Sequence, residues 1–355
     1  MTNLRSIPLT RATGLGSLPS LFEARAGERA LLKAFAAEGI PFSVTEALST
    51  PIPLISMLGI FDRCARHLGD RTFGLEVGEM MNYSAFGLWM AHGVDAPTLG
   101  EAVRRLGATS WSHQSGCRVG IVDRGSHVVV HYRAHRSVGA RAAHTDHIIA
   151  PTISIARSYL GRDWSPDWVE VNYPRDCDAA LLEDRLQLPV VYGSDVVGIG
   201  LRREDLHRRR SERPVPPLRL VTLREVVADT VLADAPEPAR TLSAIVAMRL
   251  LDGKSDIEGA ARLAGLSVQG LQRRLREKGY TYREVLDAAR QARAVALLRE
   301  TELPIVSIAL NVGYEDHASF TRAFHRWTGH SPSEARRQMA LIKGRPPPFA
   351  HHANG

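Results

Sequence analysis

Two short stretches in the last third of the chain place hydrogen-bonding side chains at helical spacing. The polar side chains in question are Gln269, Gln272, Arg273 and Arg276 in residues 257–279, and His317, Thr321, Arg322 and Arg326 in residues 305–329. Leu271 and Leu275, and likewise Phe320, Phe324 and Trp327, recur three or four residues apart and would form the opposite, core-facing side of each helix. Arginine and glutamine can form paired hydrogen bonds with guanine and adenine edges, and threonine can contact a base or a thymine methyl. The two polar faces therefore have the chemistry needed to read the major groove of DNA.

The elements that position these side chains form a repeat. Gly265 and Gly313 are 48 residues apart, and the leucine and phenylalanine that begin each core face are 49 apart. Each copy is predicted to be a short apolar helix, a turn with glycine and a second helix, which is a helix-turn-helix unit. Ser267 can cap the second helix of the first copy, and Glu315 or Asp316 can complement the N-terminus of its counterpart.

A long helix is predicted between the two units. It runs from about Tyr282 to Glu300, ends before Pro304, and would span ~28 Å at 1.5 Å per residue. Adjacent major grooves on one face of DNA lie about 34 Å apart, so this helix could hold both units on one face. A last helix is predicted to begin with Ser331 as its cap, Pro332 in its first turn and Glu334 as the capping-box partner.

The charge distribution agrees with a polyanionic partner for this region. The chain carries a net charge of +7 at pH 7. Residues 240–355 contain 18 Lys and Arg against 11 Asp and Glu, so the whole excess lies in the last third. A basic segment beside a neutral one favours nucleic-acid binding by the former and another task for the latter.

The remainder of the chain predicts a separate α+β domain. Residues 53–68, 98–106 and 141–161 have helical periodicity, whereas residues 117–134 alternate around Gly125-Ser126 like a hairpin, and residues 168–174 are typical of a strand. The prolines within residues 206–220 and the break at 233–242 interrupt this pattern. We predict four parts, which are a sensing and dimerisation domain at 20–210, a linker at 211–239, an all-α domain of seven helices with two helix-turn-helix units at 240–342, and a disordered tail at 343–355.

Composition excludes several other classes of protein. No run reaches the roughly 18 to 20 uncharged apolar residues of a membrane helix, and the first 20 residues lack the apolar core of a secretion signal. Three widely spaced cysteines argue against a disulfide framework and against a structural zinc site. Nucleotide-binding loops and nucleophile elbows are also absent from the sequence. We predict a cytoplasmic protein that is not an enzyme and needs no cofactor or metal.

The two helix-turn-helix stretches resemble sequences of a known protein family. The stretches "AARLAGLSVQGLQRRLREKGYTYREVLDAAR" and "LPIVSIALNVGYEDHASFTRAFHRWTGHSPSEAR" are similar to the two halves of the DNA-binding module of the AraC/XylS family of bacterial transcription regulators. The resemblance implies a seven-helix module that binds double-stranded promoter DNA, activation as the commoner outcome, and RNA polymerase as a partner. It also implies base-reading positions at Gln269, Gln272, Arg273, His317, Thr321 and Arg322.

The N-terminal part resembles the arabinose-binding-like sensor domain that accompanies this module in part of the family. The similarity is carried by "FGLEVGEMMNYSAFGLWMAHGVDAPTLGEAVRRL" and covers about residues 30–205. It implies a small-molecule effector of unknown identity and a homodimer. Aromatic side chains could line the effector pocket, and the candidates are Tyr83, Phe86, Trp89, Trp111 and Tyr132.

Two alternatives remain open from the sequence. His144 and His147 lie three residues apart on one predicted helix and could serve a metal-responsive or haem-responsive sensor. Alternatively, the chain could be an architectural DNA binder whose N-terminal domain only dimerises.

Overall fold

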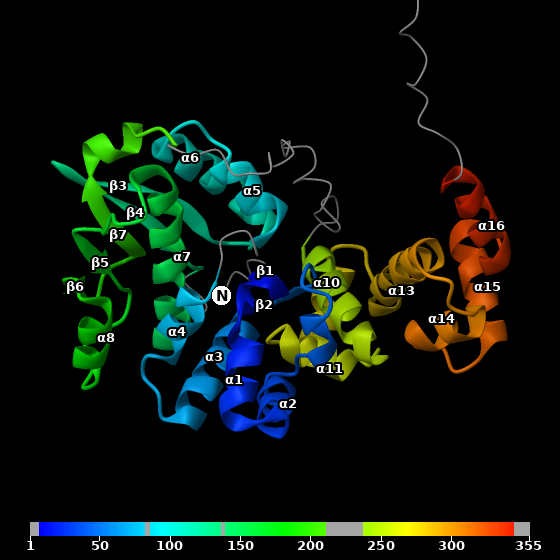
Figure 1. Ribbon diagram of the computed structural model, residues 1–355. Coiled ribbons are helices and arrows are strands. Elements are labelled where there is room, and N and C mark those ends of the chain that lie inside the picture. The colour runs from blue at the N-terminus through cyan, green and yellow to red at the C-terminus, as the bar shows by residue number, and fades with distance from the viewer. Residues whose placement is uncertain (1–6, 82–85, 136–138, 211–236, 344–355) are drawn as a thin grey trace, which may run out of the picture. The chain divides into compact units, whose positions relative to one another are not determined.

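The chain is divided into two compact units, Met1–Asp234 and Ala235–Gly355. The computed structural model describes residues 7–81, 86–135, 139–210 and 237–343 (Figure 1). Most of the predicted linker, residues 211–236, and all but the first residue of the predicted tail lie outside the described residues. Within the described ranges, no helix is both long enough and apolar enough to cross a membrane.

A five-stranded sheet organises unit 1. Its strands are β3 (Arg118–Arg124), β4 (His127–Arg133), β5 (Trp168–Glu170), β6 (Val190–Val191) and β7 (Val197–Arg202). Their order is β3-β4-β7-β5-β6, in which only the β5–β6 pair is parallel. Arg124 pairs with His127 across the turn, where Gly125 has a φ of 78°. The predicted hairpin is therefore confirmed.

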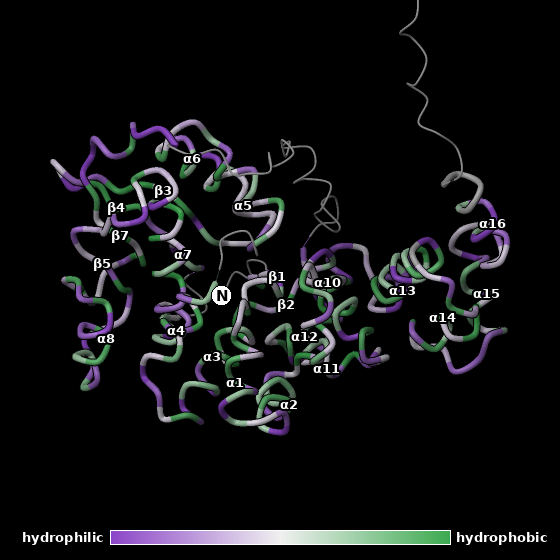
Figure 2. The backbone as a smooth tube through the Cα atoms, in the orientation of Figure 1, coloured by the Kyte–Doolittle hydropathy of each residue, from purple (hydrophilic) through white to green (hydrophobic). Residues whose placement is uncertain are grey.

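The long helix α7 (Ala142–Leu160) packs against the sheet, and the core of unit 1 forms between them. Val128 and Val130 of β4 meet Ile149 and Ile153 of α7 there, and the valine run of β4 is visible as a hydrophobic stretch (Figure 2). The other elements of unit 1 are β1 (Leu9–Arg11), η1 (Ala12–Leu15), α1 (Leu18–Ala26), α2 (Glu28–Ala37), η2 (Phe42–Thr45), β2 (Pro51–Pro53), α3 (Leu54–Leu68), α4 (Phe73–Glu79), α5 (Leu88–Val94), α6 (Leu99–Thr109), η4 (Ser110–Ser112), α8 (Ala179–Leu186) and η6 (Arg203–His207). The α+β fold class is confirmed, and β1 at Leu9–Arg11 already belongs to unit 1, before the predicted start at residue 20.

Two glycines let α4 lie unusually close to α7. A Cβ at Gly74 would overlap the carbonyl group of Ala143, and one at Gly78 would overlap the carbonyl oxygen of His147. Only glycine permits this approach, because backbone atoms cannot move aside as a flexible side chain can. The sequence "FGLEVGE" thus fixes how closely α4 packs against the helix that carries His144 and His147.

We expect Gly74→Ala to lower the free energy of unfolding of unit 1 by about 1 to 3 kcal/mol, because the added methyl must separate two helices. Urea denaturation followed by tryptophan fluorescence measures this, since Trp89, Trp111, Trp164 and Trp168 all lie in unit 1. Gly14→Ala is the control, because its Cβ would meet the mobile end of Met57 rather than backbone. Equal effects of the two changes would contradict this account.

Unit 2 consists of seven α-helices in its described residues. They are α10 (Ala239–Arg249), α11 (Ile257–Leu263), α12 (Val268–Arg276), α13 (Tyr282–Glu300), α14 (Ile305–Asn311), α15 (His317–Thr328) and α16 (Pro332–Lys343), with a short 3-10 turn η7 (Leu250–Asp252) after the first. Seven helices agree with the fold class expected from the sequence. The start and end of α13 are the predicted residues, and the capping box of Ser331 and Glu334 is formed by reciprocal hydrogen bonds.

Candidate DNA-reading helices and ligand cavity

The first helix-turn-helix unit is formed by α11 and α12. Gly265 ends α11 with a φ of 64°, and the Ser267 hydroxyl accepts a hydrogen bond from the backbone N–H of Gly270, as predicted. Leu271 and Leu275 are buried on the inner side of α12. This side fixes the rotation of the helix, so the opposite side is presented to solvent.

The four predicted readers of α12 all lie on its exposed side. They are Gln269, Gln272, Arg273 and Arg276. Nε of Arg273 is 3.8 Å from Oε1 of Glu277, and Nε of Arg276 donates to the carbonyl of Gln272 at 3.3 Å. Both contacts are within one exposed helix and are weak, so the guanidinium groups can turn toward a ligand at low cost.

The second unit is formed by α14 and α15. Gly313 has a φ of 77° in the turn, and the Asp316 carboxylate caps α15 by accepting from the N–H of Ser319 at 2.7 Å. Phe320 and Phe324 are fully buried in a cluster that Trp327 joins. The aromatic residues of this stretch are therefore core, as expected.

The predicted readers of α15 are less uniform than those of α12. His317 and Arg322 are exposed, and Nη2 of Arg322 donates to Oγ of Ser319 at 3.0 Å. Arg326 is exposed but forms an ion pair with Asp287 of α13, with 3.1 Å between Nη2 and Oδ2. Thr321 is half-buried, and its Oγ1 is buried without a hydrogen-bond partner in the described part of the chain. Among the four, His317 and Arg322 are thus best placed to meet DNA.

The helix α13 is anchored to the second unit by arginines to which the sequence assigned no role. Arg290 donates from Nε to the carbonyl of Val312 at 2.9 Å and from Nη2 to that of Gly313 at 2.8 Å. Its guanidinium also lies over the ring of Tyr314, 4.5 Å from the centroid. These contacts hold the turn of the second unit on α13, which spans ~28 Å over its 19 residues.

Unit 1 contains a cavity of about 110 Å³ between α5, α6, α7 and the β3–β4 hairpin. Phe86, Trp89 and Tyr132, three of the predicted effector candidates, line it. Trp111 does not line it, since this side chain is 45% exposed and its Nε1 donates to the carbonyl of Ala108. Tyr83 lies outside the described residues. Three of the five predicted residues therefore line the cavity, because aromatic content alone does not determine which ring faces inward.

Three buried histidines line the cavity, together with the half-buried His131 of β4. His113 stacks on Trp89, with 4.8 Å between ring centroids and 9° between planes. His144 and His147 of α7 pack against Phe61 of α3, and Nδ1 of His147 is 2.5 Å from the carbonyl oxygen of His144. Nowhere in the described ranges are three or more His, Cys, Asp or Glu side chains grouped so that they could hold a metal ion. Burial lowers the pKa of His113 to about 3 and that of His147 to about 4, and lowers the pKa of His144 as well.

These histidines should make unit 1 less stable in mild acid. Their folded pKa lies below the unfolded value of about 6.5, so the unfolded chain takes up protons that the folded chain does not. Stability is therefore complete above pH 7 and falls as pH drops through 6.5 toward 4. For His113 and His147 together we expect a loss of about 3 kcal/mol between pH 7.5 and 5.5, measured by urea denaturation. The measured loss also includes a contribution from His144, and His147→Gln should reduce it by about 1.4 kcal/mol. An unchanged pH dependence would contradict the assignment.

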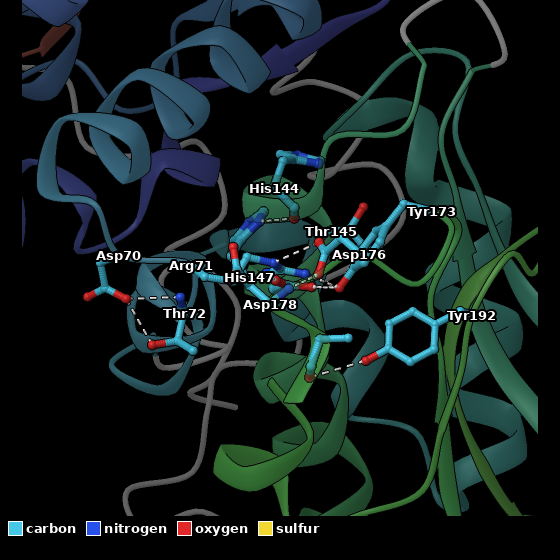
Figure 3. Close-up of polar contacts among 12 residues, drawn as sticks. Asp70, Arg71, Thr72, His144, Thr145, His147, Tyr173, Asp176, Asp178 and Tyr192 are labelled. Atoms are coloured by element: carbon cyan, nitrogen blue, oxygen red, sulfur yellow. Dashed lines mark hydrogen bonds and ion pairs between the residues drawn. The ribbon is translucent and has the colours of Figure 1, made fainter. Parts of the chain in front are cut away.

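Beside the cavity, a buried ion pair joins three segments of unit 1 (Figure 3). Asp146 of α7 is fully buried and forms an ion pair with Arg71, while Tyr173 donates to its Oδ1 at 2.6 Å. Arg71 also donates to Tyr173 at 2.9 Å and to Asp176 at 3.0 Å. Burial raises the pKa of the Asp146 carboxyl to about 6, although Arg71 and Tyr173 act in the opposite direction. At neutral pH the pair is charged and ties α7 to the segments before α4 and after β5.

Two helix-turn-helix units joined by one anchored helix, together with a cavity in a separate unit, define a DNA-binding regulator with a ligand-sensing domain. A family model described as the arabinose-binding domain of AraC transcription regulator, N-terminal, matches residues 30–209, and a helix-turn-helix model matches residues 260–338. The chain belongs to the AraC family of transcription regulators, in which a small-molecule effector controls DNA binding.

Relatives of the chain are transcription regulators. The HTH-type transcriptional regulator VqsM of Pseudomonas aeruginosa is 26% identical over 281 residues, which cover 74% of this chain and 83% of that protein. The ornithine utilization regulator of the same species is 44% identical over 81 residues, 23% of this chain and 24% of that protein. Among solved structures, the transcriptional regulator CdpR from Pseudomonas aeruginosa matches with a TM-score of 0.38 at 22% identity, over 89% of this chain and 98% of that one.

Proposed function

We propose that α12 and α15 read two boxes on one face of promoter DNA, and that occupancy of the cavity in unit 1 controls this reading. The observation that carries the proposal is the matched design of the two helices, each with a buried apolar side and an exposed side of arginine with glutamine or histidine. Gln269, Gln272, Arg273 and Arg276 would read the first box, and His317, Thr321 and Arg322 the second, with Arg326 free to join only if it leaves Asp287.

Control by an effector is supported by the position of the cavity wall. The helix α7 both lines the cavity and carries Asp146, so a ligand that shifts α7 would act on the segments tied to it by Arg71 and Tyr173. A ligand can change DNA affinity only by binding two states of the protein unequally. An architectural DNA binder would have no use for such a cavity, so we propose a ligand-controlled regulator instead. We further propose that it is a cytoplasmic homodimer without enzymatic activity that activates transcription by contacting RNA polymerase.

A change in box spacing tests the reading of two boxes. Inserting about five base pairs between the boxes turns the second box to the opposite face of the duplex. Because Arg290 and Arg293 hold the second unit on α13, the protein cannot follow, and affinity should fall to that of one box alone. The measurement is a mobility-shift titration on both DNAs. Unchanged affinity would mean that only one of the two units binds DNA.

A further inference from the structure

The cavity wall contains no charged side chain among its described residues. Apolar groups from α5, α6 and α7 surround it, and its polar members are histidine, glutamine, cysteine, tyrosine and threonine. A carboxylate, phosphate or ammonium group inside would lose its hydration without gaining a counter-charge, which is costly. The wall therefore favours a neutral ligand.

Most polar groups of the wall are already paired with one another. Nε2 of Gln114 donates to the Tyr132 hydroxyl at 2.5 Å, Nε1 of Trp89 donates to the carbonyl of Leu106 at 3.1 Å, and Sγ of Cys117 donates to the carbonyl of Gln114 at 3.3 Å. A sugar, which carries several hydroxyl groups, would need several unpaired partners. Apart from its histidines, this wall supplies few of them.

The histidines keep hydrogen-bonding capacity. A carbonyl oxygen can only accept, so Nδ1 of His147 must carry the proton in its contact with His144, and Nε2 of that neutral ring is an acceptor. Nδ1 of His113 and Nδ1 of His131 are buried and have no partner within the described residues, although both rings line the cavity. The acceptor at Nε2 of His147 suits a ligand that brings one donor group.

The shape of the cavity further limits which ligands can bind. The stacked rings of Trp89 and His113, with Phe86 edge-on at 5.4 Å from His113, form an aromatic surface against which a flat ring can lie. The volume of about 110 Å³ is of the order of the roughly 150 Å³ cavity that accommodates benzene in another protein. One ring fits this space better than a larger skeleton.

We propose that the effector is a neutral, single-ring aromatic compound with one hydrogen-bond donor, such as a phenol, held by the rings of Trp89, His113 and His147. The inference rests on the proposed function, in that it assigns the chemistry of the effector to the same cavity.

Four probes of similar size test this chemistry on the full chain. Phenol, toluene, benzoate and L-arabinose are titrated at pH 7.5 by calorimetry and by quenching of tryptophan fluorescence. Phenol should bind about tenfold more tightly than toluene, because one hydrogen bond is gained, and at least tenfold more tightly than benzoate and arabinose.

Two variants locate the binding site. His113→Phe and His147→Phe keep a ring and remove its nitrogens, so phenol should bind them about as weakly as toluene does. Toluene binding should persist and would show that the cavity is still folded. The exposed His207 lies outside the cavity wall, and His207→Phe is the control that should leave phenol affinity unchanged.

The outcomes separate this inference from the proposed control of DNA binding. Tighter binding of benzoate or arabinose than of phenol, or no binding of any probe, would overturn the assigned chemistry, as would phenol binding that ignores both histidines. If phenol binds as expected but leaves the affinity for promoter DNA unchanged, the assigned chemistry stands and the control function fails.

Discussion

Arg71→Ala should lower the free energy of unfolding of unit 1 by about 3 to 5 kcal/mol at pH 7.5, the cost of leaving a buried charge without its partner. Asp146 is fully buried, and after the change only Tyr173 would contact its carboxylate. The loss should shrink at pH 6, because the unpaired carboxyl can take up a proton there. Urea denaturation at the two pH values measures both effects.

The matched control is Arg175→Ala. Arg175 also forms an ion pair, with two hydrogen bonds to Glu183 at 3.2 and 3.1 Å, but on the exposed surface of the same unit. Its removal should change stability little, because exposed ion pairs contribute little. The double variant Arg71→Met with Asp146→Asn should recover part of the loss, since no charge then remains buried. A loss below about 1 kcal/mol for Arg71→Ala would contradict the role given to this pair.

Arg273→Ala and Arg322→Ala should each weaken specific DNA binding by about 1 to 3 kcal/mol, or about 5-fold to 150-fold, if these side chains read bases. Both side chains are exposed on the outer sides of α12 and α15, so folding should be unaffected. Mobility-shift titrations on the preferred site and on unrelated DNA of equal length distinguish contacts to bases from contacts to phosphates. A loss of affinity for the preferred site alone indicates a base contact.

The control for these variants is Arg283→Ala. Arg283 is exposed at the start of α13, outside both recognition helices, and its removal takes away the same charge. It should weaken binding to all sequences slightly and equally. If Arg273→Ala and Arg322→Ala behave as Arg283→Ala does, they contact phosphates or nothing, and the assignment to base reading is wrong.

Local signals made unit 2 largely predictable from its sequence. The caps at Ser267, Asp316 and Ser331 each depend on residues within three positions, and the glycines of the turns need no distant partner. Helical periodicity separated core from exposed residues correctly, except that Thr321 lies nearer the core than expected. Such features follow from short-range geometry, which a sequence displays directly.

Contacts between distant segments could not be foreseen in the same way. Arg71 and Asp146 are 75 residues apart in the sequence, and Arg290 reaches carbonyl groups 22 and 23 residues away. His113 was not recognised because neither periodicity nor a motif marks a residue that lies between α6 and β3. Trp111 and Trp89 are equally aromatic, yet only the packing of α5 against α6 decides that Trp89 faces the cavity. His144 and His147 do lie together, and both line the cavity of unit 1.

Selection of bound sequences from random duplex DNA by the full chain, at two salt concentrations, tests the central claim most directly. A chain that reads DNA through α12 and α15 should select two boxes about one helical turn apart, and both boxes should persist at the higher salt concentration. Unselective binding that disappears steeply with salt would instead show that the exposed sides of these helices attract DNA only by charge, and would contradict the account.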